Sequence, residues 1–398
     1  MKKLLSLGGN YYQSTMVREA RRMGLYIIGA DNNPLNCAHQ LENKYYNIST
    51  IDKEKILAIA QKEQIDGIIS YASDVGALTA AYVAEKMGLP TNPLRTIELM
   101  TRKDLFHPFL SSKGFNAPET TYVESPDGIK EFIRTHGTSI VKPVNSSGSK
   151  GITIISNESQ AAEAFNKAIS FDKDGQVIAE EYFEKSGYQI SGDIFVVDGK
   201  VRNWGFANAH RDQECNPLVP IGDSFPIYLD SLHLDIAKHE IQHALTELGF
   251  KNGPVNVEFF FDSSDRPIIV ELGPRSGGGL LPDIIYMTSG IDIIQYCIKN
   301  SLGMSIDDII DKPMTRNISA YCFHSRKDGI FANLDIKDKL WAKILQIEYF
   351  VQAGERVYRC DDSSKAIAIA ICEFESQDEM LDMMDNMNEY YEVIYDGT

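Results

Sequence analysis

The strongest pattern along the chain is a pair of apolar runs, Val255–Phe261 and Pro267–Leu272, separated by Asp-Ser-Ser-Asp-Arg. Val, Ile and Phe dominate both runs, and the residues between them favour a turn, so the pattern predicts a β-hairpin. Each run carries one acid, Glu258 in the first and Glu271 in the second. An unpaired carboxylate is costly in an apolar strand, which indicates that each acid has a cationic partner. Two acids on adjacent strands can share a divalent metal such as Mg²⁺, whereas the alternative is a surface hairpin with two solvated glutamates.

Residues 1–92 alternate between strand-like and helical patterns, which predicts βαβ units and a Rossmann-like parallel sheet. Ligands bind at the carboxyl ends of the strands in such sheets. Asn10, Asp31 and Asp74 stand at or near those ends and are therefore candidates for contacts with a substrate. The expected elements, in chain order, are Lys3–Leu7, Ser14–Met23, Leu25–Ala30, Lys53–Lys62, Gly67–Tyr71 and Val75–Met87.

Residues 93–113 predict a linker with two helices, and Lys103 lies in the second. Residues 114–185 predict a small α/β lobe, in which the loop Asn145–Gly151 joins two strands. A loop of small residues can bring backbone N–H groups to phosphate oxygens, although such loops are more often plain flexible turns. Lys142, on the strand before the loop, favours the phosphate-binding interpretation. The expected elements of the lobe are Thr120–Val123, Asp127–Arg134, Ser139–Val144, Ile152–Ile155 and Val177–Phe183.

The remainder of the chain predicts further strands and helices. Strands Gln189–Val197 and Val201–His210 are separated by Asp-Gly, a hairpin signal, and an irregular stretch, Asp212–Pro226, follows. His210 and Arg211, just before that stretch, are further candidates for substrate contacts. Residues 301–398 predict a polar helix followed by β-rich segments. Later elements are expected at Leu232–Leu248, Ile291–Asn300, Asn317–Phe323, Ile344–Val351, Lys365–Phe374, Gln377–Asn388 and Tyr390–Tyr395.

Composition narrows the class of protein. At 398 residues the chain is long enough for two or three domains. Its formal net charge of −17 argues against non-specific binding of nucleic acid or anionic membranes. From Asp361 onward, 11 acids accompany a single base, Lys365, and interleave with apolar residues at helical spacing, which indicates a solvated face. No apolar run is long enough for a signal-peptide core or a membrane helix, and the six cysteines contain no Cys-x-x-Cys, so we expect a cytoplasmic protein with free thiols.

One motif points to a different chemistry. His239-Glu240-Ile241-Gln242-His243 fits H-E-x-x-H on a predicted helix, the spacing of a zinc hydrolase. No third ligand is evident downstream. The same helix carries an apolar stripe typical of a helix packed on a sheet, and we favour that packing role over zinc binding.

An ordered series of motifs over residues 1–300 resembles the ATP-grasp superfamily. The resemblance is to its carboxylate–amine ligase branch, which includes carbamoyl-phosphate synthetase large subunits, biotin carboxylases and ligases of purine biosynthesis. It implies α/β and α+β architecture: a Rossmann-like parallel sheet, then an ATP-grasp fold with a small lid lobe and a β-rich C-terminal portion. The series is Thr101-Arg102-Lys103, Val141-Lys142-Pro143, the Ser/Gly loop, Ala179-Glu180-Glu181-Tyr182, Asn256-Val257-Glu258-Phe259 and Glu271-Leu272-Gly273-Pro274-Arg275.

The resemblance implies a role for each matching residue. Glu258 and Glu271 would bind Mg²⁺, with Mn²⁺ as the alternative ion. Arg275 would stabilise an acyl phosphate, and Lys103 and Lys142 would contact the phosphates of ATP, Lys142 also lying near the adenine. The mobile loop over the phosphates would be Ser146, Ser147, Gly148, Ser149, Lys150 and Gly151, and the hinge at the adenine would be Glu180, Glu181, Tyr182 and Phe183.

Two positions depart from the family pattern. The last metal motif usually reads Glu-x-Asn-x-Arg, but Gly273 stands in the place of the Asn. One metal ligand is therefore missing, or is supplied from elsewhere, with Asn256 as one source. The position of a ribose-binding Glu is taken by Gln189, which forms hydrogen bonds but carries no charge.

The resemblance implies five regions and an activity. The regions are 1–92, the Rossmann-like domain; 93–113, the helical linker; 114–185, the lid lobe; 186–300, the core lobe with the metal site; and 301–398, an α+β region packed on the core. The expected activity is ATP- and Mg-dependent formation of a C–N bond between a small carboxylate and an amine. The alternatives are a kinase of a carboxylate, carbamate or amide, a nucleotide-binding protein without catalysis, and the zinc hydrolase. Nucleic acid and membranes are not expected partners, and a homodimer is the commonest assembly on symmetry grounds.

Overall fold

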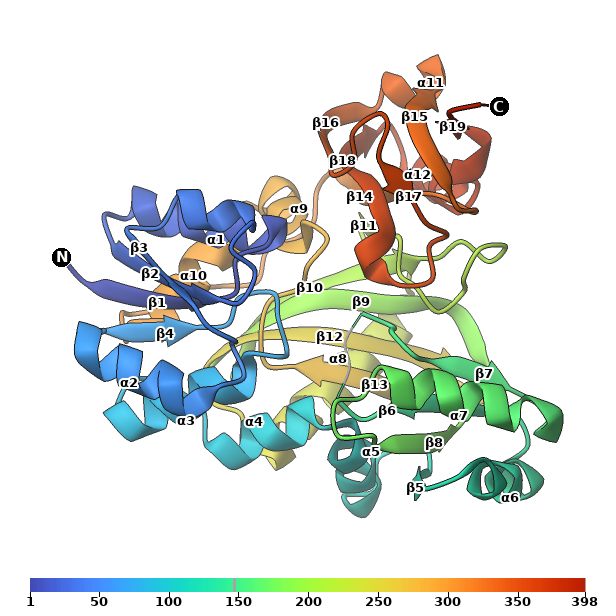
Figure 1. Cartoon of the computed structure of the whole chain (residues 1–398), viewed down its shortest axis with the longest axis horizontal. Coiled ribbons are helices and arrows are strands. Elements are labelled where there is room, and N and C mark those ends of the chain that lie inside the picture. Colours follow the sequence, from blue (N-terminus) through green and yellow to red (C-terminus); the bar gives the residue numbers. More distant parts are fainter. Residues whose placement is uncertain (146–147, 398) are drawn as a thin grey trace.

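The computed structural model describes residues 1–145 and 148–397. Its N-terminal part is a parallel sheet flanked by helices, as the alternating pattern predicts (Figure 1). The strands lie in the order β3-β2-β1-β4. The sequence analysis missed β3, a short strand without a fully buried residue. The bounds are β1 Lys3–Leu7, α1 Tyr11–Arg22, β2 Tyr26–Asp31, η1 Cys37–Gln40, β3 Lys44–Asn47, α2 Lys53–Glu63, β4 Gly67–Ile69 and α3 Ala77–Met87.

Two short helices connect this part to an antiparallel sheet of order β5-β8-β6-β7, which has two helices packed on it. The sequence analysis missed the second of them, α7, which buries three alanines and so shows little apolar contrast. The bounds are α4 Leu94–Thr101, α5 Lys103–Ser112, β5 Thr120–Val123, α6 Pro126–His136, β6 Ser139–Pro143, β7 Thr153–Ile155, η2 Glu158–Gln160, α7 Ala161–Ser170 and β8 Val177–Glu181.

An eight-stranded antiparallel sheet forms the centre of the molecule, in the order β13-β12-β9-β10-β11-β14-β18-β16 (Figure 1). Helices α4, α5 and α8 pack against one face of it. Helices α9 and α10, together with α1 of the N-terminal part, pack against the other. The bounds are β9 Lys185–Val197, β10 Lys200–His210, β11 Gly222–Phe225, α8 Ser231–Leu248, β12 Gly253–Asp262, β13 Pro267–Gly273, α9 Leu281–Ser289 and α10 Ile293–Ser301.

The C-terminal region continues the same sheet, because β14 pairs with β11 and β18 pairs with β14. A second sheet, β17-β15-β19, covers it. The expectation of a polar helix at the start of this region is wrong, because residues 302–316 form turns and no helix. Gly303 and Pro313 interrupt the segment, and its apolar residues, Ile306 and Ile309, pack separately into the core. The bounds are β14 Asn317–His324, β15 Gly329–Ile336, α11 Asp338–Trp341, β16 Ile344–Tyr349, β17 Arg356–Val357, η3 Ser363–Lys365, β18 Ala366–Phe374, α12 Gln377–Asp385, η4 Met387–Glu389 and β19 Tyr391–Tyr395.

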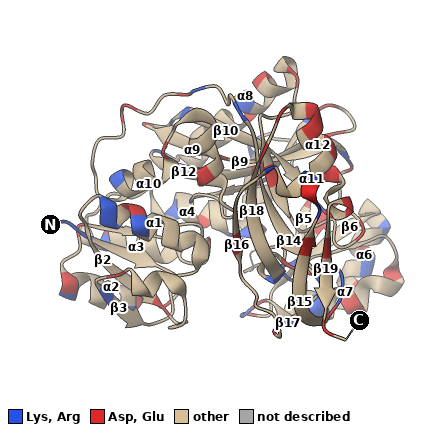
Figure 2. Cartoon of the chain, turned by 90° about the horizontal axis from the view of Figure 1, so that it is seen from above, with Lys and Arg blue, Asp and Glu red and all other residues tan. Residues whose placement is uncertain are grey.

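The acidic C-terminal region agrees with a solvated face. Figure 2 shows Asp and Glu along α11 and α12, while Met380, Met383 and Met384 on the inner side of α12 are buried. Among the residues that the structure describes, no helix has the length and apolar character that crossing a membrane requires. The five regional boundaries named above stay a prediction.

Candidate active site

The predicted hairpin is formed by β12 and β13, and Glu258 lies directly opposite Glu271 in its register. Directly opposite residues project from the same face of a sheet, so the two carboxylates share one side. The register shifts just beyond this pair, where Val270 has no opposite residue. Such a bulge bends a strand locally and re-aims its side chains. The facing acids, which the sequence analysis predicted, are thus present.

Asp74, from the loop after β4, reaches this pair from the N-terminal part. Its carboxylate accepts two hydrogen bonds of 2.7 Å from Arg275, whose Nη2 also lies 3.6 Å from Glu271. Burial raises the pKa of Glu271 to about 7, and the neighbouring carboxylates of Asp74 and Glu258 act in the same direction. Burial therefore disfavours the ionised form of Glu271, and a cation bound here would favour it.

Gly273 has a physical reason in this arrangement. A Cβ atom at position 273 would lie 3.1 Å from Oδ1 of Asp74 and 3.4 Å from the Arg275 guanidinium. The side chain of an Asn would therefore collide with the ion pair between these two residues. Asn256 lies opposite Gly273 in the register, and its Nδ2 donates to the Gly192 carbonyl at 3.1 Å and to Asp193 at 3.0 Å. That its amide oxygen supplies the missing ligand stays a prediction.

The side chains of Lys142 and Glu180 form a buried ion pair between β6 and β8. His107 of α5 lies 2.9 Å from Glu180 through Nδ1 and 3.2 Å from the Ile269 carbonyl through Nε2. Burial alone would raise the pKa of Glu180, but Lys142 and His107 outweigh it and lower that pKa to about 2. The side chain of Glu180 therefore anchors Lys142, and the hinge role of residues 180–183 at the adenine stays a prediction.

Lys103 begins α5 and lies among the same charges. Burial lowers the pKa of its ammonium group, and Lys142 adds to this, while Glu271 and Asp74 act in the opposite direction. Gln189 on β9 donates a 2.8 Å hydrogen bond to Glu258 and accepts one of 3.2 Å from Lys185. An amide at position 189 orients Glu258 without the repulsion that a second carboxylate would introduce.

Comparisons with known proteins agree with this geometry. Residues 110–250 match the model of the family described as prokaryotic glutathione synthetase, ATP-grasp domain. The formate-dependent phosphoribosylglycinamide formyltransferase of Sulfurisphaera tokodaii is 31% identical over 328 residues, which cover 77% of this chain and 78% of that protein. The chain belongs to the ATP-grasp family, in its branch of ATP-dependent carboxylate–amine ligases.

Solved structures show the same fold as this ATP-grasp chain. The L-amino acid ligase of Bacillus licheniformis superposes with a TM-score of 0.82 at 19% identity, over 100% of this chain and 99% of that one. The biotin carboxylase domain dimer of the Hydrogenobacter thermophilus 2-oxoglutarate carboxylase, solved with MgADP, gives 0.75 at 17% identity, over 99% and 90%. ATP and Mg²⁺ are the cofactors of ATP-grasp enzymes, and a pair of facing carboxylates fits a hard divalent cation.

The phosphate loop and the hinge, two groups of residues that the ATP-grasp resemblance assigns, are only partly tested. Ser146 and Ser147 of the predicted phosphate loop lie outside the described residues. In the rest of the loop, Ser149 donates to the Leu218 carbonyl at 2.9 Å. At the hinge, the N–H groups of Glu181 and Tyr182 donate to carbonyls of Glu119 and Thr138, so carbonyl groups and Phe183 remain for the adenine edge.

The five candidates for substrate contacts do not all lie in the same place. Asp74 lies in the site, and Arg211 is influenced by Glu258 and Asp223. Asn10 caps α1 through Gln13, and Asp31 bonds within its own loop to Asn33 and Asn36. The expectation for His210 is wrong: it bonds Asp385 and Ser224, each at 2.8 Å, on the face of β10 opposite to Ala209. Strand alternation places neighbouring residues 209 and 210 on opposite faces, and the sequence could not tell which face is the site.

Two further polar residues, Ser191 and Asp193, were not predicted, although they alternate with Gln189 along β9. Gln189, Ser191 and Asp193 recur at every second position, which in an otherwise apolar strand indicates a polar face. Asp193 is fully buried and accepts the Gly277 N–H at 2.7 Å and 2.8 Å with its two oxygens. It thereby fixes the Gly-rich turn after Arg275. Burial raises the pKa of Asp193 to about 6.

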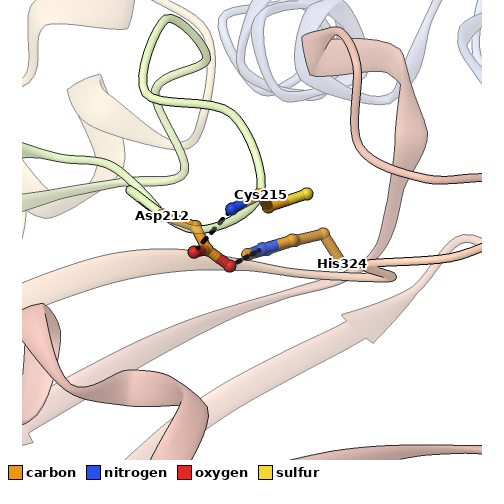
Figure 3. A group of neighbouring side chains, drawn as sticks. All are labelled: Asp212, Cys215 and His324. Carbon is orange, nitrogen blue, oxygen red and sulfur yellow. Dashed lines mark hydrogen bonds and ion pairs between the residues drawn. The ribbon is translucent and has the colours of Figure 1, made fainter.

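Two other groups contain residue types that bind metals, Asp212 with Cys215 and His324, and His239 with His243. Neither group has the character of a metal site. Figure 3 shows His324 and the backbone of Cys215 directed at Asp212, but Arg326 already binds that carboxylate with bonds of 2.7 Å and 2.8 Å. Burial also raises the pKa of the Cys215 thiol, which disfavours the thiolate that a metal needs.

The H-E-x-x-H histidines are exposed on the outer side of α8. The side chain of His243 stacks on Phe115, at 4.8 Å between ring centroids. Within the described part of the chain, no third metal-ligating side chain joins His239 and His243.

Proposed function

We propose that this ATP-grasp enzyme phosphorylates a small carboxylic acid with ATP and joins the resulting acyl phosphate to an amine. One observation carries the proposal: Glu258 and Glu271 face each other beside Arg275, with Lys103 influenced by Glu271. Phosphoryl transfer requires carboxylates that bind a divalent cation and positive side chains that contact the phosphoryl oxygens. The reason is that charge and positioning dominate its barrier.

The residues of the site divide the work. Glu258 and Glu271 hold Mg²⁺, or Mn²⁺ in its place, and Gln189 orients Glu258. When bound, the cation supplies positive charge to the phosphate oxygens of ATP. Lys103 and Lys142 bind those phosphates as well, and the anchoring of Lys142 by Glu180 keeps it in place. Phe183 and the hinge carbonyls contact the adenine, and residues 148–151 cover the phosphates and exclude water.

The reaction balances in two steps. In the first, a carboxylate oxygen of the acid attacks the terminal phosphorus of ATP and ADP leaves. In the second, the nitrogen of the amine attacks the acyl carbon, inorganic phosphate leaves with the bonding electrons, and the amine loses a proton. Arg275 stabilises the charge on the acyl phosphate in both steps. Arg211 gives the acid a second cation.

The proposal is tested by ADP release with Mg-ATP and a panel of small acids, with hydroxylamine as the amine. Hydroxylamine converts an acyl phosphate to a hydroxamate, so ADP and hydroxamate are expected in equal amounts. Glu271→Gln is expected to reduce both by at least about 100-fold, as loss of a charge-stabilising group does. ADP without a hydroxamate or an amide would instead support a kinase. A homodimer and a cytoplasmic location stay predictions, which gel filtration and cell fractionation would test.

A further inference from the structure

Asp223 on β11 is an acid in the site without a cationic partner. Its carboxylate accepts a hydrogen bond from the hydroxyl of Ser191, and it forms no ion pair with any residue in 1–145 or 148–397. Asp74 and Glu180 differ in this respect, because Asp74 binds Arg275 and Glu180 binds Lys142. Burial raises the pKa of Asp223 and Glu258 adds to this, while the Ser191 hydrogen bond, His210 and Arg211 act to lower it without compensating for the burial.

Two alanines and a glycine border Asp223. The bond between Ser191 on β9 and Asp223 on β11 spans β10, where the register places Ala207 opposite Ser191 and Ala209 opposite Asp223. These are small side chains. Across from them, a Cβ added at Gly279 would meet only Oδ2 of Asp223 within 4 Å, at 3.9 Å. The Gly-rich turn therefore faces the carboxylate without placing a side chain against it.

Arg211 supplies the opposite charge next to this space. It follows Ala209 by two positions and forms no hydrogen bond or ion pair with any described residue. Burial lowers the pKa of its guanidinium, while Glu258 and Asp223 both act to raise it, so Arg211 is within electrostatic reach of both acids. A guanidinium has five N–H donors in a planar fork that suits a carboxylate or phosphate. An anionic group at Arg211 would lie on the side of the metal-binding acids.

We propose that the acid activated by this enzyme is an amino acid, whose ammonium group binds Asp223 and whose carboxylate binds Arg211 beside the metal site. The inference rests on the proposed function and names its substrate class. An ammonium group has three donors, and it would give Asp223 the cation that the protein does not provide. The Ser191 hydroxyl, which donates to Oδ1, holds the carboxylate in place for it.

The test compares pairs of acids that differ only in the amino group: alanine with propionate, and leucine with 4-methylpentanoate. ADP release is measured with Mg-ATP and hydroxylamine. A site built to bind a polar group discriminates strongly against ligands that lack it. We therefore expect the wild type to have a kcat/KM roughly 100-fold or more higher for the amino acids. Asp223→Asn is expected to remove most of that preference by raising KM for amino acids, with kcat/KM for the des-amino acids unchanged within about twofold.

The matched control is Asp198→Asn, the same substitution in the exposed turn of the β9–β10 hairpin, which is expected to leave every constant unchanged. Binding of Mg-ADP to each variant shows that the nucleotide site is intact. Equal losses for both classes of acid in Asp223→Asn, or a wild type that does not prefer amino acids, would overturn the inference while leaving the ligase intact. Absence of ADP release with every acid would overturn the proposed function, and with it the inference.

Discussion

Asp74 and Arg275 are 201 positions apart in sequence, and their side chains are joined by two hydrogen bonds of 2.7 Å. The pair connects the N-terminal parallel sheet to the metal-binding hairpin. Both side chains are largely shielded from solvent, with 21% of Asp74 and 13% of Arg275 exposed. Charge pairs in such surroundings are costly to break singly, because the remaining charge loses its partner.

Asp74→Ala is expected to lower the free energy of unfolding by about 2–3 kcal/mol. The substitution removes the partner that accepts two hydrogen bonds from Arg275, and only the more distant Glu271 remains nearby. Urea unfolding measures the change. The control is Asp127→Ala, which breaks the surface pair with Lys130 and is expected to have no measurable effect. Equal stability of the two variants would contradict the structural importance of the Asp74 pair.

Gly273→Asn is expected to cost about 1–3 kcal/mol in the wild-type background, because the new side chain overlaps the ion pair. In the Asp74→Ala background the same change should cost less, since the obstructing carboxylate is gone. A double-mutant cycle by urea unfolding measures this coupling. Strict additivity of the two substitutions would show that Asp74 is not the reason for the glycine.

Glu180 is expected to make stability sensitive to acid. Its pKa is about 2 in the folded protein, whereas an unperturbed Glu has a pKa of about 4.3. Its contribution, on the order of 3 kcal/mol, is complete above about pH 4.3 and is lost as the pH falls towards 2. The measurement is the slope of unfolding free energy against pH between about 2 and 5, compared with Lys142→Gln/Glu180→Gln, which removes both charges. An unchanged slope in the double variant would contradict the assignment.

Metal affinity is expected to depend on pH through Glu271. Because its pKa is raised to about 7 and a metal binds the ionised carboxylate, affinity should fall about tenfold per unit as the pH drops below about 7. Mn²⁺ titration followed by electron paramagnetic resonance measures this in the presence of ADP. Glu271→Gln is expected to bind more weakly and with a flatter pH profile. A wild-type affinity that is constant from pH 5 to pH 8 would exclude this role.

The exposed histidines of α8 are expected to have no part in activity. His239→Ala/His243→Ala should fold, bind Mg-ATP and release ADP as the wild type does, because both rings lie on the outer surface of the helix. Metal analysis of the purified protein is expected to find no stoichiometric zinc. Zinc that is lost together with activity in this variant would instead support a hydrolase.

The sequence was sufficient for the parts of the site that depend on local patterns. Apolar runs with one acid each predicted the hairpin that places Glu258 opposite Glu271, and the alternation over residues 1–92 predicted the parallel sheet. The elements that were missed include β3, α7, α9 and β15; β3 has only four residues and none of them is fully buried, so its alternation is weak.

The parts that the sequence did not reveal depend on distant contacts. The reason for Gly273 lies in Asp74, and the anchor of Lys142 includes His107 from another helix. Asp223 was overlooked because it stands in an irregular stretch whose strand, β11, has only four residues. No local pattern assigns such a residue to a face of the central sheet, since its neighbours β10 and β14 are far apart in the chain.

The pairing of β11 with β14 has a consequence for how this enzyme can be divided. Strand β11 has one edge on β10 and the other on β14, so a chain cut after α10 would leave that edge unpaired. Exposed strand edges promote aggregation, and a four-residue strand held on one side only would lose its register easily. A fragment that keeps β11 paired on both edges must therefore include β14, so the C-terminal region contributes to the integrity of the sheet that carries the candidate active site.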